Sequence, residues 1–432
     1  MTEFNEILPE NTVFVHVSFE GPDRYSLAGG LGVRTSELSE ALAREGFETH
    51  LFFVGSPDAP PREVEEDGRH LWRVCQEICS RYPTGVYQGE GEKLAEFERS
   101  VPGLLLNEIA RPAVEKGKLL VIMGEDWHTA STMCAISDLL YWQGLRGHAI
   151  LLWNANSLFG FDNIDWVRLQ TATRVTAVSR YMKQLMWPRG VNALVLPNGI
   201  PERHLEPVPS AHVQLLRAAL PNRVVLTKFA RFDPDKNWLP AVQAVARLQA
   251  LEQQPLFFMR GGVESYGLQV LARIDSLGLR RYDLTLDNPT VENFVEAVKA
   301  IEGETDIVVL RFYVPEEIQR LLYRASHAVL ANSGHEPFGL VGLEVMAARG
   351  IAFVGSTGEG YAQHLLNAIS LDTGDPNEIV GNLVYLQNHP QASANLRRVG
   401  HLTARFYIWP RVIEKLISKL QYLLMGGGTT WP

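Results

Sequence analysis

Apolar runs of strand length recur along the first half of the chain and alternate with segments of helical period. Within residues 12–199 the runs are "TVFVHVSF", "THLFFVG", "KLLVIMG", "HAILLW", "VTAVS" and "ALVLPNG". After the first run, "TSELSEALAREG" places Leu38, Ala41 and Leu42 on one helical face, and Gly46 ends the helix. This alternation is typical of a parallel sheet with helices on both faces.

The segment "IPERHLEPVPSAHVQ" interrupts the pattern with three prolines and no periodicity, which predicts a linker. A second series follows, with "RVVLTKFA", "PLFFMRGG", "DIVVLRF", "HAVLANSG" and "IAFVGSTG". A chain of 432 residues also exceeds what one core usually organises. We therefore expect an α/β fold of two doubly wound, Rossmann-like domains, 1–205 and 216–405, facing each other across a cleft where their strands end.

The charge balance narrows the choice of partners. The formal net charge is −9, and most of the excess of acidic over basic residues lies in the N-terminal half, with 26 acidic and 18 basic residues in 1–200. This argues against nucleic acid and allows at most peripheral membrane contact. No apolar run approaches the roughly 20 residues of a membrane span, and acidic residues stand where a secretory signal would be basic. The expected location is the cytoplasm.

Three glycines follow the first apolar run, in "AGGLGVRTSELSEAL". Gly29, Gly30 and Gly32 would let backbone amides and a helix N-terminus approach an anion closely. The turn lacks the lysine and the serine or threonine of a Walker loop. Tight strand-to-helix turns use glycine for steric reasons equally often, so both interpretations stay open.

Two cations follow the first strand of the second half, in "FARFDPDKNW". Arg231 and Lys236 on such a loop would suit a diphosphate, whose charge must be neutralised as it departs as a leaving group. A solvated surface pair is the alternative, and the spacing alone favours it.

The segment "SGHEPFGLVGLEVMAARG" is more specific. If a helix begins near Gly339, the free amides from Phe338 through Leu340 and onward point out of its N-terminus and form a receptor for phosphate. Glu344 then lies beside the buried face, where ribose hydroxyls would offset its desolvation. Glu336 on the loop tip would reach the group attached to the diphosphate. This order matches a sugar nucleotide; the alternative is a Glu344 paired with a buried arginine and a solvated Glu336.

With "LPNGI" and the terminal "YIWPRVIEKLISKLQYLL" added, these motifs resemble the retaining glycosyltransferases of the GT-B fold. The chain is most similar to family 4 of that classification, to which glycogen synthase is related, over residues 13–425. The resemblance implies that the donor binds to the C-terminal domain and the acceptor to the N-terminal one. It also implies that residues 406–432 cross back to the N-terminal domain, and that the site needs no metal and no cofactor.

The same resemblance assigns roles on the donor side. Arg231 and Lys236 match the basic pair that holds the diphosphate. Glu336 matches the glutamate that faces the donor sugar, and Glu344 the one on the ribose. Gly30 would also lie on the donor side.

On the acceptor side, "GEDWHTA" resembles the related segment "HDWHTA". This resemblance implies that Asp126 and His128 lie near the acceptor and that Asp126 is also a catalytic residue. His128 serves equally well as a hydrogen-bonded structural residue. Asn154 takes the place of a histidine found in many relatives. Leu27 and Val33 replace the lysine and aspartate of glycogen and starch synthases, so glycogen synthesis is not expected.

The function predicted from these motifs is a retaining, metal-independent hexosyltransferase of polysaccharide biosynthesis. It would move a sugar from a nucleoside-diphosphate sugar to a hydroxyl acceptor, which is a glycan, a lipid-linked molecule or a small molecule. A catalytically inactive nucleotide-sugar-binding scaffold or regulatory protein is the alternative from another class. A sugar-nucleotide epimerase is the third.

Overall fold

The structure is a computed structural model that describes residues 6–301, 303–357 and 360–426. The chain divides into two compact units. Unit 1 takes the residues up to Gly199 and those from Trp409 onward, and unit 2 is Ile200–Ile408. None of the helices in the described ranges combines the length and the apolar character that crossing a membrane requires.

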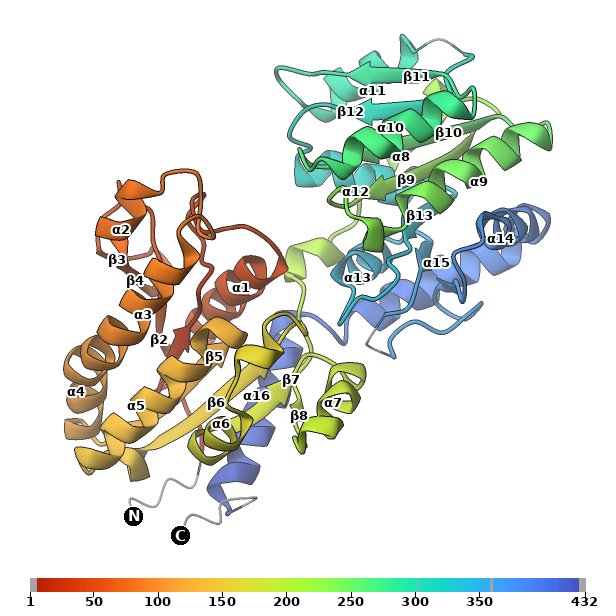
Figure 1. The fold of residues 1–432 in the computed structure, drawn as a ribbon. Helices are drawn as coiled ribbons and strands as arrows, with labels where there is room; N and C mark the ends of the chain where they lie inside the picture. The colour runs from red at the N-terminus through yellow and green to blue at the C-terminus, as the bar shows by residue number, and fades with distance from the viewer. Residues whose placement is uncertain (1–5, 302, 358–359, 427–432) are drawn as a thin grey trace. The chain divides into compact units, whose positions relative to one another are not determined.

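Unit 1 is built on one eight-stranded sheet in which only the edge pair β3–β4 is antiparallel (Figure 1). The strand order across the sheet is β3 (Arg62–Val64), β4 (His70–Val74), β2 (Glu48–Val54), β1 (Thr12–Val17), β5 (Leu119–Glu125), β6 (Ala149–Ala155), β7 (Arg174–Ala177) and β8 (Leu194–Val195). The α-helices of this unit are α1 (Gly30–Arg44), α2 (Gln76–Arg81), α3 (Glu90–Leu105), α4 (Arg111–Glu115), α5 (Ala130–Trp142), α6 (Trp166–Ala172), α7 (Arg180–Met186) and α16 (Trp409–Leu424).

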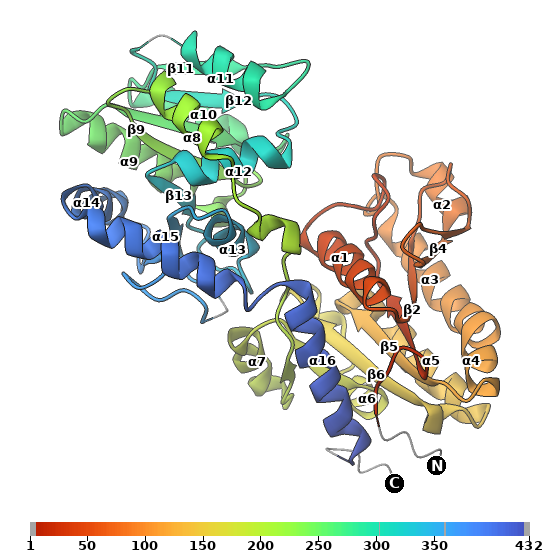
Figure 2. The ribbon, with the colours of Figure 1, turned by 180° about the vertical axis from the view of Figure 1, so that it is seen from behind.

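Helices cover the two faces of the unit 1 sheet. Apolar residues of α1 and α16 share one cluster with Phe14 of β1 and Val121 of β5, and Figure 2 shows α16 beside α1. Elsewhere in the unit, helix α5 packs against both α3 and α6. The last helix is also tied down by a hydrogen bond of 2.9 Å from Trp409 Nε1 to Glu37 Oε2. Helix α16 is therefore an integral part of unit 1.

Unit 2 repeats this plan with a seven-stranded sheet whose strands all pair in parallel. The strand order is β11 (Arg281–Leu284), β12 (Ile307–Leu310), β10 (Pro255–Arg260), β9 (Val224–Phe229), β13 (Ala328–Ala331), β14 (Ala352–Val354) and β15 (Ile369–Ser370). Its α-helices are α8 (Ser210–Ala219), α9 (Trp238–Ala250), α10 (Tyr266–Ser276), α11 (Val291–Lys299), α12 (Glu316–Ala325), α13 (Leu340–Ala347), α14 (Pro376–Asn388) and α15 (Pro390–Ala404).

Two apolar layers sandwich the unit 2 sheet. Leu226 of β9 packs in a cluster with residues of α9, α10 and α14, whereas Val225 packs in a second cluster with residues of α8, α11 and α12. Helix α8 occupies part of the segment for which the sequence predicts a linker. Its buried residues Val213 and Leu216 are only three positions apart, so the helical period was too short to recognise.

Both sheets reverse their strand order beside a central strand. In unit 1, β1 lies between β2 and β5, and in unit 2, β9 lies between β10 and β13. In doubly wound sheets, ligands bind outside the carboxyl ends of the strands at such a reversal. The loops that follow β1, β5, β9 and β13 are therefore where each unit positions its functional side chains.

Candidate functional site

The loops after β9 and β13 bring two of the predicted donor-side residues together. Lys236, in a short 3-10 turn after β9, places Nζ 2.5 Å from Glu336 Oε2. The Glu336 N–H donates to Ser356 O at 3.0 Å, which fixes the loop tip against the loop after β14. Glu336 is thus held in an ion pair across two loops, and the alternative of a merely solvated carboxylate is wrong for this structure.

Arg231 lies on the same loop as Lys236 but is exposed. Its backbone carbonyl accepts a hydrogen bond of 2.8 Å from Trp238 Nε1, which anchors the chain at this point. In the described part of the chain, no carboxylate forms an ion pair with its guanidinium. The two cations of the predicted pair therefore differ: Lys236 is paired, and Arg231 is available.

Helix α13 begins at Leu340, directly after Gly339, as the sequence predicts. Gly339 has a φ of 81°, a left-handed conformation that favours glycine, and its carbonyl accepts a hydrogen bond of 2.5 Å from Tyr361 Oη. Phe338 is buried against Tyr361 and Tyr407. This packing fixes the first turn of the helix, whose backbone N–H groups have no intrahelical partners and carry the positive end of the dipole.

Glu344 lies in the second turn of α13, and its two hydrogen-bond partners are neutral. Gln319 Nε2 and Tyr323 Oη of α12 each lie 3.4 Å from Glu344 Oε2. Burial raises the pKa of Glu344 above its ordinary value. These two long hydrogen bonds leave the carboxylate able to accept further hydrogen bonds. Among the described residues no arginine pairs with Glu344, so the alternative of a buried arginine partner is wrong.

Lys228 of β9 belongs to this region but was missed from the sequence. Its Nζ donates to Asn332 Oδ1 at 2.6 Å and to Leu330 O at 3.1 Å, and it lies 5.2 Å from the ring centre of Trp238. Burial, and after it the charge of Lys236, lowers the pKa of Lys228 to about 7. A lone lysine inside the apolar strand "RVVLTKFA" was the signal that could have revealed it.

In unit 1 the glycine turn before α1 already holds a carboxylate. Glu20 Oε2 accepts hydrogen bonds from the N–H groups of Ala28, Gly29 and Gly32, at 3.2, 2.9 and 3.0 Å. Tyr87 Oη donates to the other oxygen of Glu20. The turn is thus a receptor for an anion, as one of the two interpretations held, but the anion it binds here is internal. A donor phosphate would reach these amides near Gly30 only by displacing Glu20.

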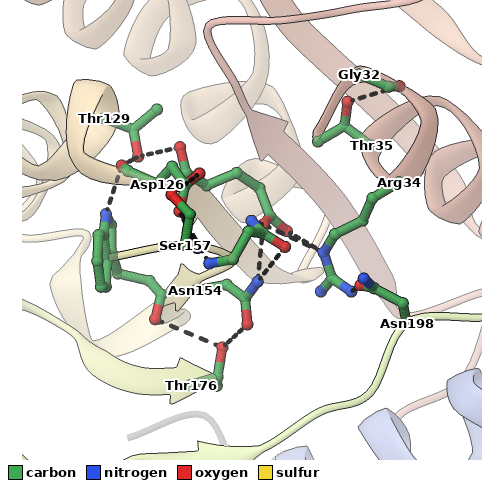
Figure 3. Close-up of polar contacts among 12 residues, drawn as sticks. Gly32, Arg34, Thr35, Asp126, Thr129, Asn154, Ser157, Thr176 and Asn198 are labelled. Atoms are coloured by element: carbon green, nitrogen blue, oxygen red, sulfur yellow. Dashed lines mark hydrogen bonds and ion pairs between the residues drawn. The ribbon is translucent and has the colours of Figure 1, made fainter. Parts of the chain in front are cut away.

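A buried polar network lies behind that turn (Figure 3). Arg34 of α1 places Nε 3.2 Å from Glu125 Oε2, with both side chains fully buried. Glu125 Oε2 also accepts hydrogen bonds from Asn154 Nδ2 at 2.9 Å and Asn156 Nδ2 at 2.6 Å. The Oδ1 atom of Asn198 accepts a hydrogen bond from Arg34 Nη1. Glu125 therefore contacts three side chains directly, and Arg34 links it to a fourth, Asn198.

Asn154 was predicted to lie on the acceptor side, but its side-chain amide forms hydrogen bonds within this network. Its Oδ1 accepts a hydrogen bond of 2.8 Å from Thr176 Oγ1, and its Nδ2 donates to Glu125 and to Asn156. The side chain is fully buried. In this structure Asn154 positions its neighbours and presents no free polar group.

Asp126 follows Glu125 at the end of β5, where it adopts a φ of 58°, unusual for a residue other than glycine. Its Oδ1 accepts hydrogen bonds from the N–H groups of Asn156 at 2.8 Å and Ser157 at 3.3 Å. Burial, and to a lesser extent the charge of Glu125, raises the pKa of Asp126 to about 7. A carboxyl that titrates near neutrality can hold or release a proton at working pH.

His128 lies close by in a 3-10 turn. Its Nε2 is 2.7 Å from Glu90 Oε1, and its ring stacks on Phe19 with the centres 4.4 Å apart. Its Nδ1 is buried and has no hydrogen-bond partner among the described residues. His128 therefore makes the structural contacts that were considered for it, and its Nδ1 atom remains unpaired among the described residues.

No protein-family model and no curated protein matches the sequence. Solved structures match over nearly the whole chain. HepE from Anabaena, in complex with UDP, is 13% identical with a TM-score of 0.62, and covers 94% of this chain and 99% of its own. Sucrose-phosphate synthase from Thermosynechococcus elongatus is 16% identical with a TM-score of 0.67, covering 96% and 100%. The α,α-trehalose 6-phosphate synthase from Burkholderia multivorans is 16% identical with a TM-score of 0.65, covering 96% and 98%.

The chain has the GT-B fold. At these identities the likeness establishes the fold alone, so the chemistry must be argued from the side chains. In unit 2, the candidate residues Lys236, Glu336 and Glu344 and the start of α13 lie beyond the carboxyl ends of β9 and β13. Unit 1 contributes Glu20, Asp126 and the network of Arg34 and Glu125.

Asp126→Asn should change how the stability of unit 1 depends on pH. Folding raises the pKa of Asp126 from 3.8 to about 7. The stability that protonated Asp126 contributes to the folded state is therefore fully present below pH 4 and is lost as the pH rises to 7. The loss is at most about 4 kcal/mol at 1.36 kcal/mol per pKa unit. Asparagine keeps an acceptor for both N–H groups, so the variant should lose less stability than the wild type between pH 5 and 8.

Urea unfolding at pH 5, 6, 7 and 8 measures this difference. The matched control is Asp58→Asn, at an exposed aspartate of the same unit, which should follow the wild-type curve. Parallel curves for the wild type and Asp126→Asn would show that Asp126 is ionised throughout this range.

Proposed function

We propose that this protein is a glycosyltransferase that moves a sugar from a nucleoside-diphosphate sugar to a hydroxyl acceptor. The observation that carries the proposal is the edge of unit 2, where Lys236 and Glu336 form an ion pair next to the loop that leads into α13. The Glu336 carboxylate suits the sugar of a donor, the Lys236 cation and the N-terminus of α13 suit its diphosphate, and the Glu344 carboxylate suits its ribose. HepE has been solved in complex with UDP and with UDP-glucose, which supports this donor class.

The side chains divide the work of the reaction. Arg231, Lys236 and the amides at the start of α13 stabilise the negative charge that develops on the departing diphosphate. These groups can supply that stabilisation without a bound metal ion or another cofactor. Glu336 orients the sugar, and Glu344 accepts a hydrogen bond from a ribose hydroxyl. Asp126 lies on the acceptor side, where a carboxyl of raised pKa can exchange a proton with a hydroxyl group.

We further propose that the reaction retains the anomeric configuration and follows the mechanism of family 4. Glu336 pairs with Lys236, and it is the one carboxylate among the donor-side residues named above to which this proposal assigns the sugar. Front-side attack through an oxocarbenium-like state therefore suits this edge better than a covalent intermediate. A hexose donor, an acceptor in polysaccharide biosynthesis and a cytoplasmic location belong to the same proposal.

A second candidate is a nucleotide-sugar-binding protein without turnover. It is favoured by unit 1, where Glu20 occupies the amides of the glycine turn and Asn154 is buried in a closed network. Both features remove groups that could otherwise bind substrate.

One experiment separates the candidates. A thermal-shift screen of nucleoside diphosphates and their sugars identifies the donor, because a ligand at a hundredfold excess over its Kd stabilises by about 2.7 kcal/mol. The donor so identified is then incubated with the protein and no acceptor. Slow release of sugar supports the transferase, binding without turnover supports the second candidate, and a changed sugar indicates an epimerase. If nothing in the screen binds, both candidates are wrong.

Arg231→Ala and Lys236→Ala should each lower turnover more than they weaken donor binding. The diphosphate gains negative charge as the bond to the sugar breaks, so a cation is worth more in the transition state than in the ground state. We expect kcat to fall by about 10- to 100-fold, the equivalent of one hydrogen bond to a charged group. The measurement is steady-state kinetics alongside calorimetry of donor binding.

Lys299→Ala is the control for these variants, because Lys299 forms an exposed pair with Glu296. It should leave both quantities unchanged. Equal losses in turnover and binding would mean that the two cations bind the donor without favouring its transition state.

Binding of a nucleoside diphosphate should be accompanied by proton uptake near pH 7.5. The pKa of Lys228 is about 7 and is already sensitive to the charges of Lys236 and Glu336, so added negative charge should raise it. Calorimetry in buffers of different ionisation enthalpy should give an uptake of about half a proton. Lys228→Met should abolish it; the same uptake in the variant would assign the proton to another group.

A further inference from the structure

A cavity of about 350 Å³ lies at the amino-terminal edge of the unit 2 sheet. Arg223 precedes β9 and His327 precedes β13, whereas the donor-side loops follow these strands. A six-residue strand spans about 20 Å, so the cavity lies far from Lys236 and Glu336. Arg217, at the end of α8, also lines it, and no acidic side chain is found among the lining residues.

More guanidinium groups lie behind this lining. We define the basic cluster as Arg217, Arg223, Arg324, Arg349 and Arg397. Arg397 donates to the carbonyls of Arg324 and Arg349, both at 3.0 Å. Burial, followed by the charges of Arg324 and Arg217, lowers the pKa of Arg397 to about 9.

The charges of Arg217, Arg324, Arg349 and Arg397 therefore act on one another. Burial, then the charges of Arg217 and Arg349, lowers the pKa of Arg324 as well. Among the residues that the structure describes, no carboxylate forms an ion pair with any member of the cluster.

Helix dipoles explain part of this arrangement but not all of it. Helices α8, α12 and α13 end near the cluster, and Arg324 and Arg397 donate to backbone carbonyls there. The charge of Asp306 acts favourably on Arg223. Each helix end carries about half a negative charge, so three ends offset about one and a half of the four other positive charges. Arg217, exposed in the last turn of α8, has only the partial charge of that helix end beside it and no carboxylate ion pair among the described residues.

The remaining hydrogen-bond donors point to a specific ligand chemistry. The N–H of Val225 donates to His327 Nδ1 at 3.0 Å, so the ring proton of neutral His327 is on Nε2 and is available. Arg217 offers the five N–H donors of its guanidinium, a geometry that suits phosphate oxygens. Leu216, Leu220 and Val225 add an apolar wall, suited to the carbon skeleton of a small ligand.

We propose that this cavity binds a small phosphomonoester, with the phosphate on Arg217 and His327 and the organic part against the apolar wall. The volume falls at the lower end of the range for small-molecule pockets. A concave site of this size does not suit a membrane surface or an extended polyanion, each of which would need a broad charged face.

Calorimetry on the full chain in chloride buffer tests the proposal with three probes: inorganic phosphate, glycerol 3-phosphate and uncharged glycerol. Glycerol 3-phosphate should bind at one site, inorganic phosphate more weakly, and glycerol not at all. The double variant Arg217→Gln/His327→Gln should lose at least about tenfold in affinity. Arg247→Gln, which changes an exposed arginine in the last turn of α9, should bind as the wild type does.

Further controls locate the phosphate. Lys236→Gln should leave the binding of glycerol 3-phosphate unchanged. If this variant loses the binding, the phosphate lies at the opposite edge of the sheet and the proposal is overturned. Binding that survives Arg217→Gln/His327→Gln would overturn it too. Arg217-dependent binding to vesicles of phosphatidylglycerol, without binding of glycerol 3-phosphate, would identify a membrane-facing patch instead. Equal unfolding midpoints without ligand confirm that the variants fold.

Discussion

Arg34→Met should lower the free energy of unfolding of unit 1 by about 3–5 kcal/mol, the cost of breaking a buried ion pair. Arg34 and Glu125 are both fully buried, with Nε and Oε2 3.2 Å apart. The variant leaves Glu125 charged and without a cation, whereas methionine fills much of the arginine's volume. Asn154 and Asn156 still donate to Glu125, so the loss should fall toward the lower end of this range.

Unfolding in urea, monitored by hydrogen exchange in peptides from β1, β5 and β6, measures the effect within unit 1. The matched control is Arg44→Met on the same helix, because the Arg44 side chain is 67% exposed and forms an i,i+4 pair with Glu40. That pair is worth only about 0.3–0.5 kcal/mol. Adding Glu125→Gln to Arg34→Met should recover part of the loss. An effect of Arg34→Met no larger than that of Arg44→Met would mean that Glu125 is not charged in the folded protein.

The strands at the centre of each sheet could be predicted because they are buried on both faces. "TVFVHVSF" and "PLFFMRGG" are continuous apolar runs, and they form β1 and β10. The missed strands lie at or next to the sheet edges. "REV" and "RYDL" form β3 and β11, whose residues are largely exposed, so their sequences carry no apolar run.

The arrangement of residues around the start of α13 could be predicted because these residues are close together in sequence. Glu336, Gly339 and Glu344 lie within nine residues, so one helix start fixes their order. The polar network of unit 1 could not be found in this way. Arg34 and Glu125 are 91 positions apart, and "GVRTSEL" looks like an exposed turn of helix until β5 is placed beside it. Glu20 was missed for another reason: it is only 8 to 12 positions from its partners, but the sequence does not show that the glycine turn folds back onto it.

Glu336→Ala and Glu344→Ala should fail in different ways, because the two carboxylates meet different parts of the proposed donor. Glu344→Ala removes a ribose contact made equally in the ground state and the transition state, so it should mainly raise the donor KM. A lost partner of a buried polar group costs about 1–3 kcal/mol. The bare nucleoside diphosphate carries the same ribose and should weaken by a similar factor.

Glu336→Ala should act on turnover instead, lowering it by about 10²–10³-fold, as the loss of one transition-state contact does elsewhere. The ion pair with Lys236 sharpens the expectation for the bare diphosphate. That ligand has no sugar to lose, and without Glu336 the charge of Lys236 is no longer neutralised. Its affinity should therefore stay the same or rise. Calorimetry with the diphosphate on both variants measures this contrast, with Glu317→Ala, at an exposed position of α12, as the control.

The sign of the change in affinity decides between the two roles of Glu336. A carboxylate that only holds the loop in place would take the diphosphate site with it when removed, and Glu336→Ala would then weaken the ligand as much as Glu344→Ala does. A carboxylate that faces the sugar leaves the diphosphate site intact and frees a cation beside it. Unchanged or tighter binding of the diphosphate, together with the loss of turnover, is the combination expected if Glu336 orients the sugar.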